Sequence, residues 1–501
     1  MENFQFISTR GENHGVTAPQ AVFQGLAPDG GLFVPEHFPH LGLDLSRIHE
    51  ISYHDLARKI LKDWLPGYTP ESIDLVVSSG YGPDTFDCPE LTPVKSFGSR
   101  HFIELFHGPT LAFKDLALSL LPRLLVEGRH QLGISKTAVI LTATSGDTGS
   151  AALTGFADVP ETKIIIFYPQ RGISPVQERQ MTCQAGGNLS VCAVDGNFDD
   201  AQAMVKQIFS NEEIKIQLSE NNSTFSTANS MNIGRLVPQM VYYFYAYGQL
   251  VKRGAVSPGA PINIVVPSGN FGNILAAWYA RAAGLPVNRF IVASNANCAL
   301  ADFFSTGKYD ADRDFLVTSS PSMDILISSN LERLLFHLGG NDAGLVCDLM
   351  DKLKRTRKYE VPPKLKTALQ HDFSAGVADD DDCHQEIHDY YEKTGYVMDP
   401  HTAVASRVLS NYRNDSGDHT TALIAATASP FKFTATVCDS LYNDCSQKSD
   451  FELIHELSRR TGLEVPRQIH NIENWVPIHN DRCLPVDANT YVRKALSIGD
   501  L

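Results

Sequence analysis

The chain has 501 residues, of which 43% are apolar, so it can bury several cores in about three domains or in two domains with a terminal elaboration. A formal charge of −15 argues against nucleic acid or an anionic membrane surface as the main partner. The N-terminus lacks a basic segment followed by an apolar one, and no stretch approaches the roughly 20 apolar residues of a membrane span.

The first 95 residues differ in pattern from the rest and predict a separate N-terminal cap. The segment GLAPDGGLFVP (25–35) is rich in turn residues, and the stretch from there to about Ser79 is typical of helices. We therefore expect three parts, which are a cap over 1–95, a core over 96–435 and a helical extension over 436–501.

The core is predicted to be α/β, because short apolar runs are each closed by a loop and followed by helix-like sequence. Continuous apolar strands alternating with helices indicate parallel sheets that are covered on both faces. Two clusters of strands, around 139–194 and 262–295, predict two α/β lobes with a ligand cleft beyond the carboxyl ends of the strands. The apolar runs lie at 139–142, 163–168, 262–267, 290–294 and 421–426.

The segment HGPTLAFKD (107–115) places Lys114 after three apolar residues. An apolar neighbourhood lowers the pKa of a lysine amine, and an amine that loses its proton easily can bind an aldehyde cofactor. The alternative is a surface cation at the start of a helix. Pro122 lies inside the helix expected after Lys114, where it should kink or end that helix.

The segment TATSGDTGS (142–150) directly follows an apolar strand. Gly146 and Gly149 permit a tight turn, and the helix N-terminus that follows presents unpaired amides to an anion. A carboxylate or a phosphate would suit this turn. The alternative is an ordinary capped turn, since Ser, Thr and Asp are preferred there in any case.

The segment ANSMNIGR (228–235) gathers amide, hydroxyl and guanidinium donors within two helical turns. Arginine matches phosphate oxygens in a bidentate manner, so this segment indicates a phosphate site. Helix capping with a surface arginine is the alternative. The donors are Asn229, Ser230, Asn232 and Arg235.

The segment PSGNFGN (267–273) lies between an apolar strand and a helix, and its glycines and asparagines favour a phosphate-binding loop. It lacks both the G-x-G-x-x-G pattern and the Walker lysine, which weakens a dinucleotide or nucleotide interpretation. A purely structural turn is the alternative.

The segment 374–383 predicts a loop that ends in an acidic helix start. We interpret its four consecutive aspartates as a solvated first helical turn rather than a metal site. Nine cysteines are present without a C-x-x-C pair, which is typical of reduced thiols in a cytoplasmic protein.

Together the segments resemble one family. HGPTLAFKD, TSGDTG, ANSMNIGR and SGNFGN occur in this order, at similar separations, in the longer class of threonine synthases. These are fold type II pyridoxal-phosphate enzymes, which share the fold of the tryptophan synthase β chain. The likeness extends to GLAPDGGLFVP, to 168–181 and to ATASPFKF (426–433), so it spans nearly the whole chain.

The resemblance implies pyridoxal phosphate as cofactor and a role for each matching residue. Lys114 matches the Schiff-base lysine, which also moves protons at Cα. Thr427 matches the hydroxyl residue at the pyridine nitrogen, a group that leaves this nitrogen largely neutral. The remaining matches are Gly269, Asn270, Phe271 and Asn273 for the cofactor phosphate, Ser145, Asp147 and Thr148 for the substrate carboxylate, and Asn229, Ser230 and Arg235 for the substrate phosphate.

The resemblance also implies a reaction. O-phospho-L-homoserine and water would become L-threonine and phosphate by γ-elimination and β-addition, in a site closed by a lobe between 145 and 240. A phospho-lyase that releases 2-oxobutanoate and a catalytically silent scaffold are the alternatives, and a monomer or homodimer is expected. Asp147 replaces the asparagine of many fold type II relatives near the cofactor's phenolic oxygen. An ionised carboxylate only accepts hydrogen bonds, so beside a phenolate Asp147 would have to be protonated or turned away.

Overall fold

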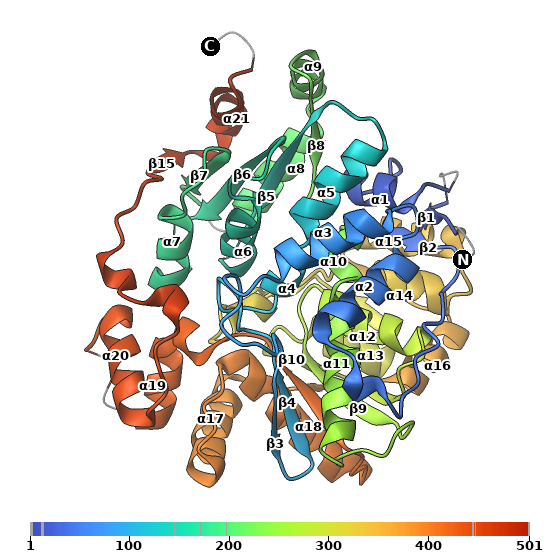
Figure 1. Cartoon of the computed structure of the whole chain (residues 1–501), viewed down its shortest axis with the longest axis vertical. Coiled ribbons are helices and arrows are strands. Elements are labelled where there is room, and N and C mark those ends of the chain that lie inside the picture. The colour runs from blue at the N-terminus through green and yellow to red at the C-terminus, as the bar shows by residue number, and fades with distance from the viewer. Residues whose placement is uncertain are drawn as a thin grey trace.

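The computed structural model describes residues 4–11, 15–144, 146–170, 173–196, 198–442, 445 and 447–498. These residues form two helix-covered sheets, one in each half of the molecule, and an N-terminal region that packs beside them (Figure 1). The two α/β lobes expected from the sequence are therefore confirmed.

The larger sheet has six strands in the order β13-β10-β9-β14-β4-β3. All neighbouring pairs are parallel except β3 and β4, which are antiparallel. The strands are β3 (Val94–Phe97), β4 (Arg100–Glu104), β9 (Ile262–Pro267), β10 (Val287–Ser294), β13 (Phe373–Val377) and β14 (Ala422–Ala426).

Both faces of this sheet are buried, which explains its continuous apolar strands. In β9, Ile264 and Val266 pack into one core, whereas Val265 between them packs into another. Successive strand residues point to opposite faces, so each face needs its own apolar set. Helix α12 covers one face and α18 the other. The helices of this half are α11 (Gln239–Lys252), α12 (Gly272–Ala282), α13 (Ala299–Thr306), α14 (Leu331–Leu338), α15 (Ala343–Thr356), α16 (Pro363–Asp372), α17 (Asp380–Thr394) and α18 (Pro400–Ser416).

The smaller sheet has five parallel strands in the order β15-β7-β6-β5-β8. They are β5 (Thr137–Ala143), β6 (Thr162–Pro169), β7 (Leu189–Val194), β8 (Ser223–Ser226) and β15 (Asp481–Cys483). Most of this lobe lies between 137 and 226, close to the range expected for a closing lobe. Its helices are α6 (Asp147–Phe156), α7 (Pro175–Thr182), α8 (Phe198–Phe209) and α9 (Glu212–Glu220).

The N-terminal region combines a strand pair with three helices. Strands β1 (Phe6–Ser8) and β2 (Phe33–Pro35) are antiparallel, and the helices are α1 (Ala18–Gln24), α2 (Tyr53–Trp64) and α3 (Pro70–Gly80). Helix α1 packs on α5 (Leu121–Gln131), and α2 packs on α11. The division into cap, core and extension stays a prediction.

The helix expected after Lys114 is divided at the position that its proline requires. Helix α4 (Asp115–Leu118) ends after one turn, and α5 starts at Leu121 with Pro122 in its first turn. Proline fits the first turn because the amide that it lacks would have no partner inside the helix. The role of Pro122 is thus to begin a second helix.

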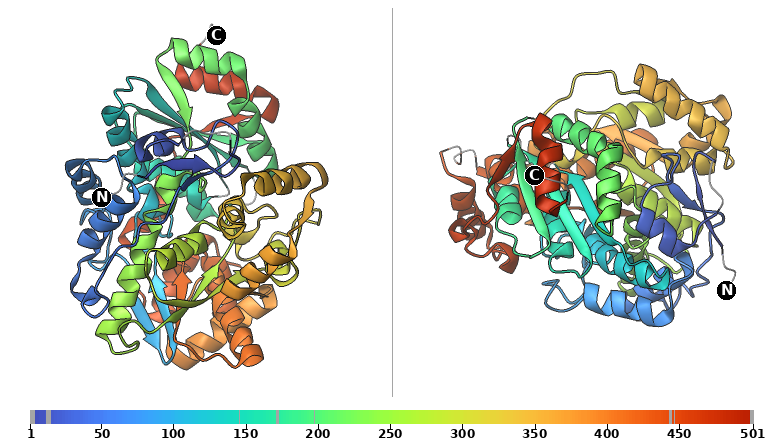
Figure 2. Two further views of the ribbon diagram at one scale, coloured as in Figure 1. Left: turned by 90° about the vertical axis from the view of Figure 1, so that its right-hand side faces the viewer. Right: turned by 90° about the horizontal axis from the view of Figure 1, so that it is seen from above.

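The C-terminal region runs along both lobes. Helices α19 (Thr434–Tyr442) and α20 (Asp450–Thr461) pack together and α19 packs on α17, whereas α21 (Ala488–Leu496) lies beside α9 at the far end of the molecule (Figure 2). One expectation was wrong, because residues 374–377 form the edge strand β13 rather than a loop. Their small side chains give little β signal, and pairing with β10 makes the strand. Among the described residues no helix is long and apolar enough to cross a membrane.

Candidate active site

Lys114 is held in place by backbone pairing with the segment that follows β14. Ala112 forms an antiparallel bridge with Ala428, and the Phe113 amide donates to the Thr427 carbonyl at 2.8 Å. Leu111 has a φ of 61°, which reverses the chain before the lysine. The structure thereby brings Lys114 and Thr427 together, although they lie far apart in the sequence.

The side chain of Lys114 is largely buried and faces charged groups on three elements. Its Nζ lies 3.4 Å from Asp147 Oδ2 at the start of α6. Burial lowers the pKa of Lys114, and the nearby cations Lys432 and Arg235 lower it further, whereas Asp147 raises it. The structure thus agrees with the depressed pKa inferred from the apolar residues before Lys114.

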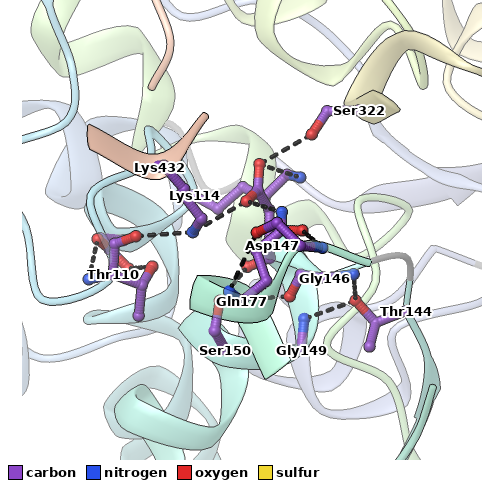
Figure 3. A network of polar contacts seen from close by, with 12 residues as sticks. Thr110, Lys114, Thr144, Gly146, Asp147, Gly149, Ser150, Gln177, Ser322 and Lys432 are labelled. Carbon is purple, nitrogen blue, oxygen red and sulfur yellow. Dashed lines mark hydrogen bonds and ion pairs between the residues drawn. The ribbon is translucent and has the colours of Figure 1, made fainter. Parts of the chain in front are cut away.

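The carboxylate of Asp147 is the centre of a polar network (Figure 3). Oδ1 accepts from Lys432 Nζ at 2.9 Å and from Gln177 Nε2 at 2.8 Å. Oδ2 accepts from Ser322 Oγ at 2.8 Å and is also the oxygen that Lys114 Nζ approaches. Burial opposes ionisation, but attraction to Lys432 and Lys114 holds the pKa of Asp147 well below its usual range. Asp147 is therefore ionised and accepts hydrogen bonds only.

The turn before α6 is organised by Thr144. Its Oγ1 accepts from the amides of Gly146 at 3.0 Å and Gly149 at 2.8 Å. Gly146 has a φ of 129°, and a Cβ on Gly149 would meet Thr144 Cγ2 at 2.4 Å, so both positions require glycine. Thr148 lies half-buried in the first turn of α6, and Ser145 lies outside the described residues.

The loop after β9 leads into α12 and suits an anion. Phe271 has a φ of 63° and precedes the first helical residue, so the amides of the first turn are open to a ligand. Asn273 is buried, and its Oδ1 accepts from the hydroxyls of Tyr242 and Tyr243. Its Nδ2 has no hydrogen-bond partner among the described residues. A buried donor without a partner fits the phosphate of a cofactor.

The segment 228–235 lies next to this loop. The hydroxyl of Ser230 lies 3.3 Å from that of Ser329, which donates to Asn270 Oδ1 at 3.1 Å. Arg235 is buried and donates to the Ala228 carbonyl at 2.9 Å, and within the described part of the chain its Nε has no hydrogen-bond partner. Burial lowers the pKa of Arg235 to about 10, so it stays a cation at neutral pH.

Two asparagines of this segment differ in role. Asn232 is fully buried, and its side chain donates to Val22 and Thr227 carbonyls at 2.9 Å each. It therefore joins α10 (Ile233–Leu236) to α1 and is structural. Asn229 is half-buried, its amide donates to Thr227 Oγ1 at 3.1 Å, and its side chain stays a candidate for substrate binding.

Sequence reasoning missed the segment 318–330, which borders both halves of the site. Besides Ser322, it supplies Ser328, whose hydroxyl donates to the Gly269 carbonyl at 2.8 Å, and Asn330, which donates to the Asn270 carbonyl at 3.0 Å. The segment is rich in serine and has no periodicity of strand or helix. Only its partners identify it as part of the site.

Lys432 was also missed. It lies in the 3-10 turn Pro430–Lys432, its side chain has no exposed surface, and it donates to the Thr110 carbonyl at 2.7 Å. Lysine is mostly exposed in proteins and is rarely buried unless it is paired. From the sequence alone, Lys432 is therefore expected at the surface. The one available signal is its place between two phenylalanines in ATASPFKF.

The fold and the site define an enzyme that depends on pyridoxal phosphate. The family described as "Pyridoxal-phosphate dependent enzyme" matches residues 88–427, and "Threonine synthase N terminus" matches residues 5–81. Within this class the chain belongs to the threonine synthase family.

Relatives of known name and structure support this assignment. Threonine synthase of Pseudomonas aeruginosa is 38% identical over 487 residues, which are 96% of this chain and 100% of that protein. The crystal structure of threonine synthase from yeast has a TM-score of 0.86 at 30% identity and covers 99% of both chains. The pyridoxal-phosphate-bound threonine synthase from Brucella melitensis has a TM-score of 0.85 at 33% identity and covers 98% of this chain and 99% of that one.

A second group of relatives is longer. Human "Threonine synthase-like 1" is 38% identical over 434 residues, which are 84% of this chain and 58% of that protein. The chain thus spans little more than half the length of these relatives.

Proposed function

We propose that the protein converts O-phospho-L-homoserine and water to L-threonine and phosphate. The observation that supports this proposal is a second set of polar groups beside the cofactor loop, which we take as a second anion site. Ser230 contacts Ser329, which donates to Asn270, and Arg235 is buried with an Nε that has no partner among the described residues. A cofactor phosphate occupies one site at most, so the other suits a substrate that carries its own phosphate.

The chain's residues divide between cofactor and substrate. Pyridoxal phosphate, when bound, supplies an aldehyde for an amine and a ring that accepts negative charge from the substrate carbons. Lys114 would bind this aldehyde and then move protons at Cα and Cβ, which its low pKa permits. We assign to the cofactor Lys114, Gly269, Asn270, Phe271, Asn273 and Thr427, and to the substrate Ser145, Asp147, Thr148, Asn229, Ser230 and Arg235.

Closure of the site is part of the proposal. Lys114 and the loop 267–273 belong to the larger lobe, whereas Asp147 opens α6 of the smaller lobe. A substrate held between them is shielded from water, which would otherwise intercept the reaction and release a ketoacid.

One assay, in which all products are measured in the same sample, distinguishes the possible reactions. The purified protein is incubated with pyridoxal phosphate and O-phospho-L-homoserine, and phosphate, threonine and 2-oxobutanoate are measured together. Threonine equimolar with phosphate is the expected result. Phosphate with 2-oxobutanoate and little threonine would instead identify a phospho-lyase, and cofactor absorbance without phosphate release would mean that the substrate is a different one.

A further inference from the structure

Lys432 connects the two lobes at the site without reaching the solvent. Its Nζ lies 2.9 Å from Asp147 Oδ1 at the start of α6, and it donates to the Thr110 carbonyl at 2.7 Å, in the loop that carries Lys114. Its side chain has no exposed surface, and Asp147 is 3% exposed. A lysine with these contacts is a built part of the site rather than a surface cation.

The charges around Lys114 come from Asp147 on α6, Lys432 in the turn after β14 and Arg235 on α10. Asp147 is the anion among them, and its Oδ2 is 3.4 Å from the Lys114 amine. A buried carboxylate at this distance stabilises an ammonium, which cannot attack an aldehyde. Asp147 alone would therefore work against the chemistry that Lys114 has to perform.

Lys432 offsets this effect. Asp147 also accepts from Gln177 and Ser322, but both are neutral donors and leave its charge in place. Lys432 adds a cation to Oδ1, on the other side of the carboxylate from Lys114. The summed charge of Asp147 and Lys432 is then close to zero, so the pair exerts little net attraction on a proton at Lys114. The carboxylate meanwhile keeps its position for hydrogen bonding.

We propose that Lys432 is a positioning residue that takes up the charge of Asp147, so that Lys114 remains a free amine and binds the cofactor aldehyde. This inference rests on Lys114 as the cofactor lysine and on no particular substrate. It also explains how position 147 can hold an aspartate in place of a neutral asparagine. Paired with Lys432, the Asp147 carboxylate adds little net charge to the site and still accepts hydrogen bonds.

The test measures how fast pyridoxal phosphate couples to the apoprotein as a function of pH. The product is trapped with borohydride, and labelling of Lys114 is quantified by mass spectrometry, without any substrate turnover. In Lys432→Met the pH midpoint of coupling should rise by about one to three units, because an opposite charge at this distance is no longer offset. Coupling at neutral pH should then slow by about 10-fold or more.

Two further variants separate charge from structure. Asp147→Asn/Lys432→Met should return the midpoint to within about half a pH unit of the wild type, because it removes both charges. Lys432→Arg keeps the cation and should stay close to the wild type. An unchanged midpoint in Lys432→Met, or a double variant as slow as Lys432→Met, would overturn the proposal.

Folding is checked by circular dichroism and thermal unfolding. If Lys432→Met does not fold, Asp147→Asn gives the same test from the other side, since it leaves Lys432 unpaired and should move the midpoint below that of the wild type. A midpoint at or above the wild-type value in that variant would also overturn the proposal. If coupling behaves as expected and the reaction assay releases no phosphate, the proposed substrate fails and the role of Lys432 stands.

Discussion

At the scale of single residues, the site depends on ionisable groups that are buried and paired in unusual ways. Burial keeps the pKa of Lys114 below that of a surface lysine, whereas its neighbour Asp115, also buried, has a pKa raised to about 6. The Asp115 carboxylate accepts from the Thr110 amide at 2.8 Å and from its hydroxyl at 2.7 Å. These two hydrogen bonds fix the loop that carries Lys114. The same loop contains Thr110, whose carbonyl accepts from Lys432.

Replacing Lys114 by alanine should abolish the visible absorbance of the bound cofactor and lower phosphate release by about 10²-fold or more, because positioned proton transfer is lost. Absorbance spectra and the phosphate assay measure both effects. Lys95→Ala, at an exposed position in β3, is the matched control and should behave as the wild type. A Lys114→Ala variant that retains normal turnover would refute the assignment.

Arg235 is predicted to bind the substrate phosphate. Arg235→Ala should raise KM for O-phospho-L-homoserine by about 10- to 100-fold, since hydrogen bonds to a charged group contribute about 1.5–3 kcal/mol. The absorbance of bound cofactor should persist. If the absorbance of bound cofactor disappears and the molecules that remain active have an unchanged KM, Arg235 binds the cofactor instead.

At the scale of elements, the site is built from the turns between strands and helices. Strands β5 and β9 each end in a glycine-containing turn that opens a helix, α6 and α12, at the carboxyl edge of its sheet. Backbone amides at helix starts attract anions in a direction set by the helix. Both turns therefore place a helix start, a feature that attracts anions, at the carboxyl edge of a sheet.

Gly149→Ala should disturb the turn before α6. The added Cβ would lie 2.4 Å from Thr144 Cγ2 and 2.7 Å from Met181 Sδ, so Thr144 must move and its two amide hydrogen bonds weaken. Overpacking of this kind costs about 1–3 kcal/mol. The unfolding temperature and the turnover rate should both fall. Gly82→Ala is the control and should change neither, because the nearest atom to its added Cβ is 3.8 Å away.

His107 joins the end of β4 to the segment before β3 and should make stability depend on pH. Partial burial opposes its protonation, but hydrogen bonds to Asp87 at 2.9 Å and Glu104 at 3.1 Å raise its pKa to about 9. The pKa is raised on folding, so this stabilisation is complete below about 6.5 and is lost as pH rises through about 9.

The measurement compares wild type with His107→Gln. The stability difference should be largest at pH 6, at about 2–3 kcal/mol, and should shrink towards pH 9.5. Thermal unfolding at both pH values reports it. A difference that stays constant with pH would show that His107 acts only through packing.

At the scale of the whole molecule, the C-terminal region holds the two lobes together. Arg467 donates to the Phe86 carbonyl at 2.8 Å, the Ile478 amide donates to the Thr182 carbonyl at 2.9 Å, and β15 adds to the edge of β7. Helix α21 buries Val492 and Leu496 against the smaller lobe. The smaller lobe is therefore packed against the C-terminal region.

Deleting residues 477–501 should lower the unfolding temperature and promote self-association. The deletion exposes the edge of β7 and the apolar surface under Val492 and Leu496, whose burial is worth about 1.5–3 kcal/mol for each side chain. Thermal unfolding and sedimentation measure the two effects. Val486→Ser, at a side chain that is 83% exposed, is the control and should leave both unchanged.

Much of the fold was predictable because its signals are local. The apolar runs at 139–142 and 262–267 lie in β5 and β9. The expected helix break at Pro122 is the boundary between α4 and α5. The acidic run after residue 379 begins α17, with Asp379 as its cap. The edge strand β13 was missed because Ser374, Ala375 and Gly376 carry little strand preference, and its partner β10 lies about 80 residues earlier in the chain.

The sequence by itself determined that Lys114 follows an apolar segment and that glycine turns follow buried strands, because these features depend on neighbours in the chain. Only the tertiary structure decided which groups surround Asp147. Ser322, Gln177 and Lys432 come from three distant segments, and no local pattern in the sequence pairs them with Asp147. The charge state of a buried group depends on its partners in space, so the pairing of Asp147 with Lys432 became visible only when the two lobes were assembled.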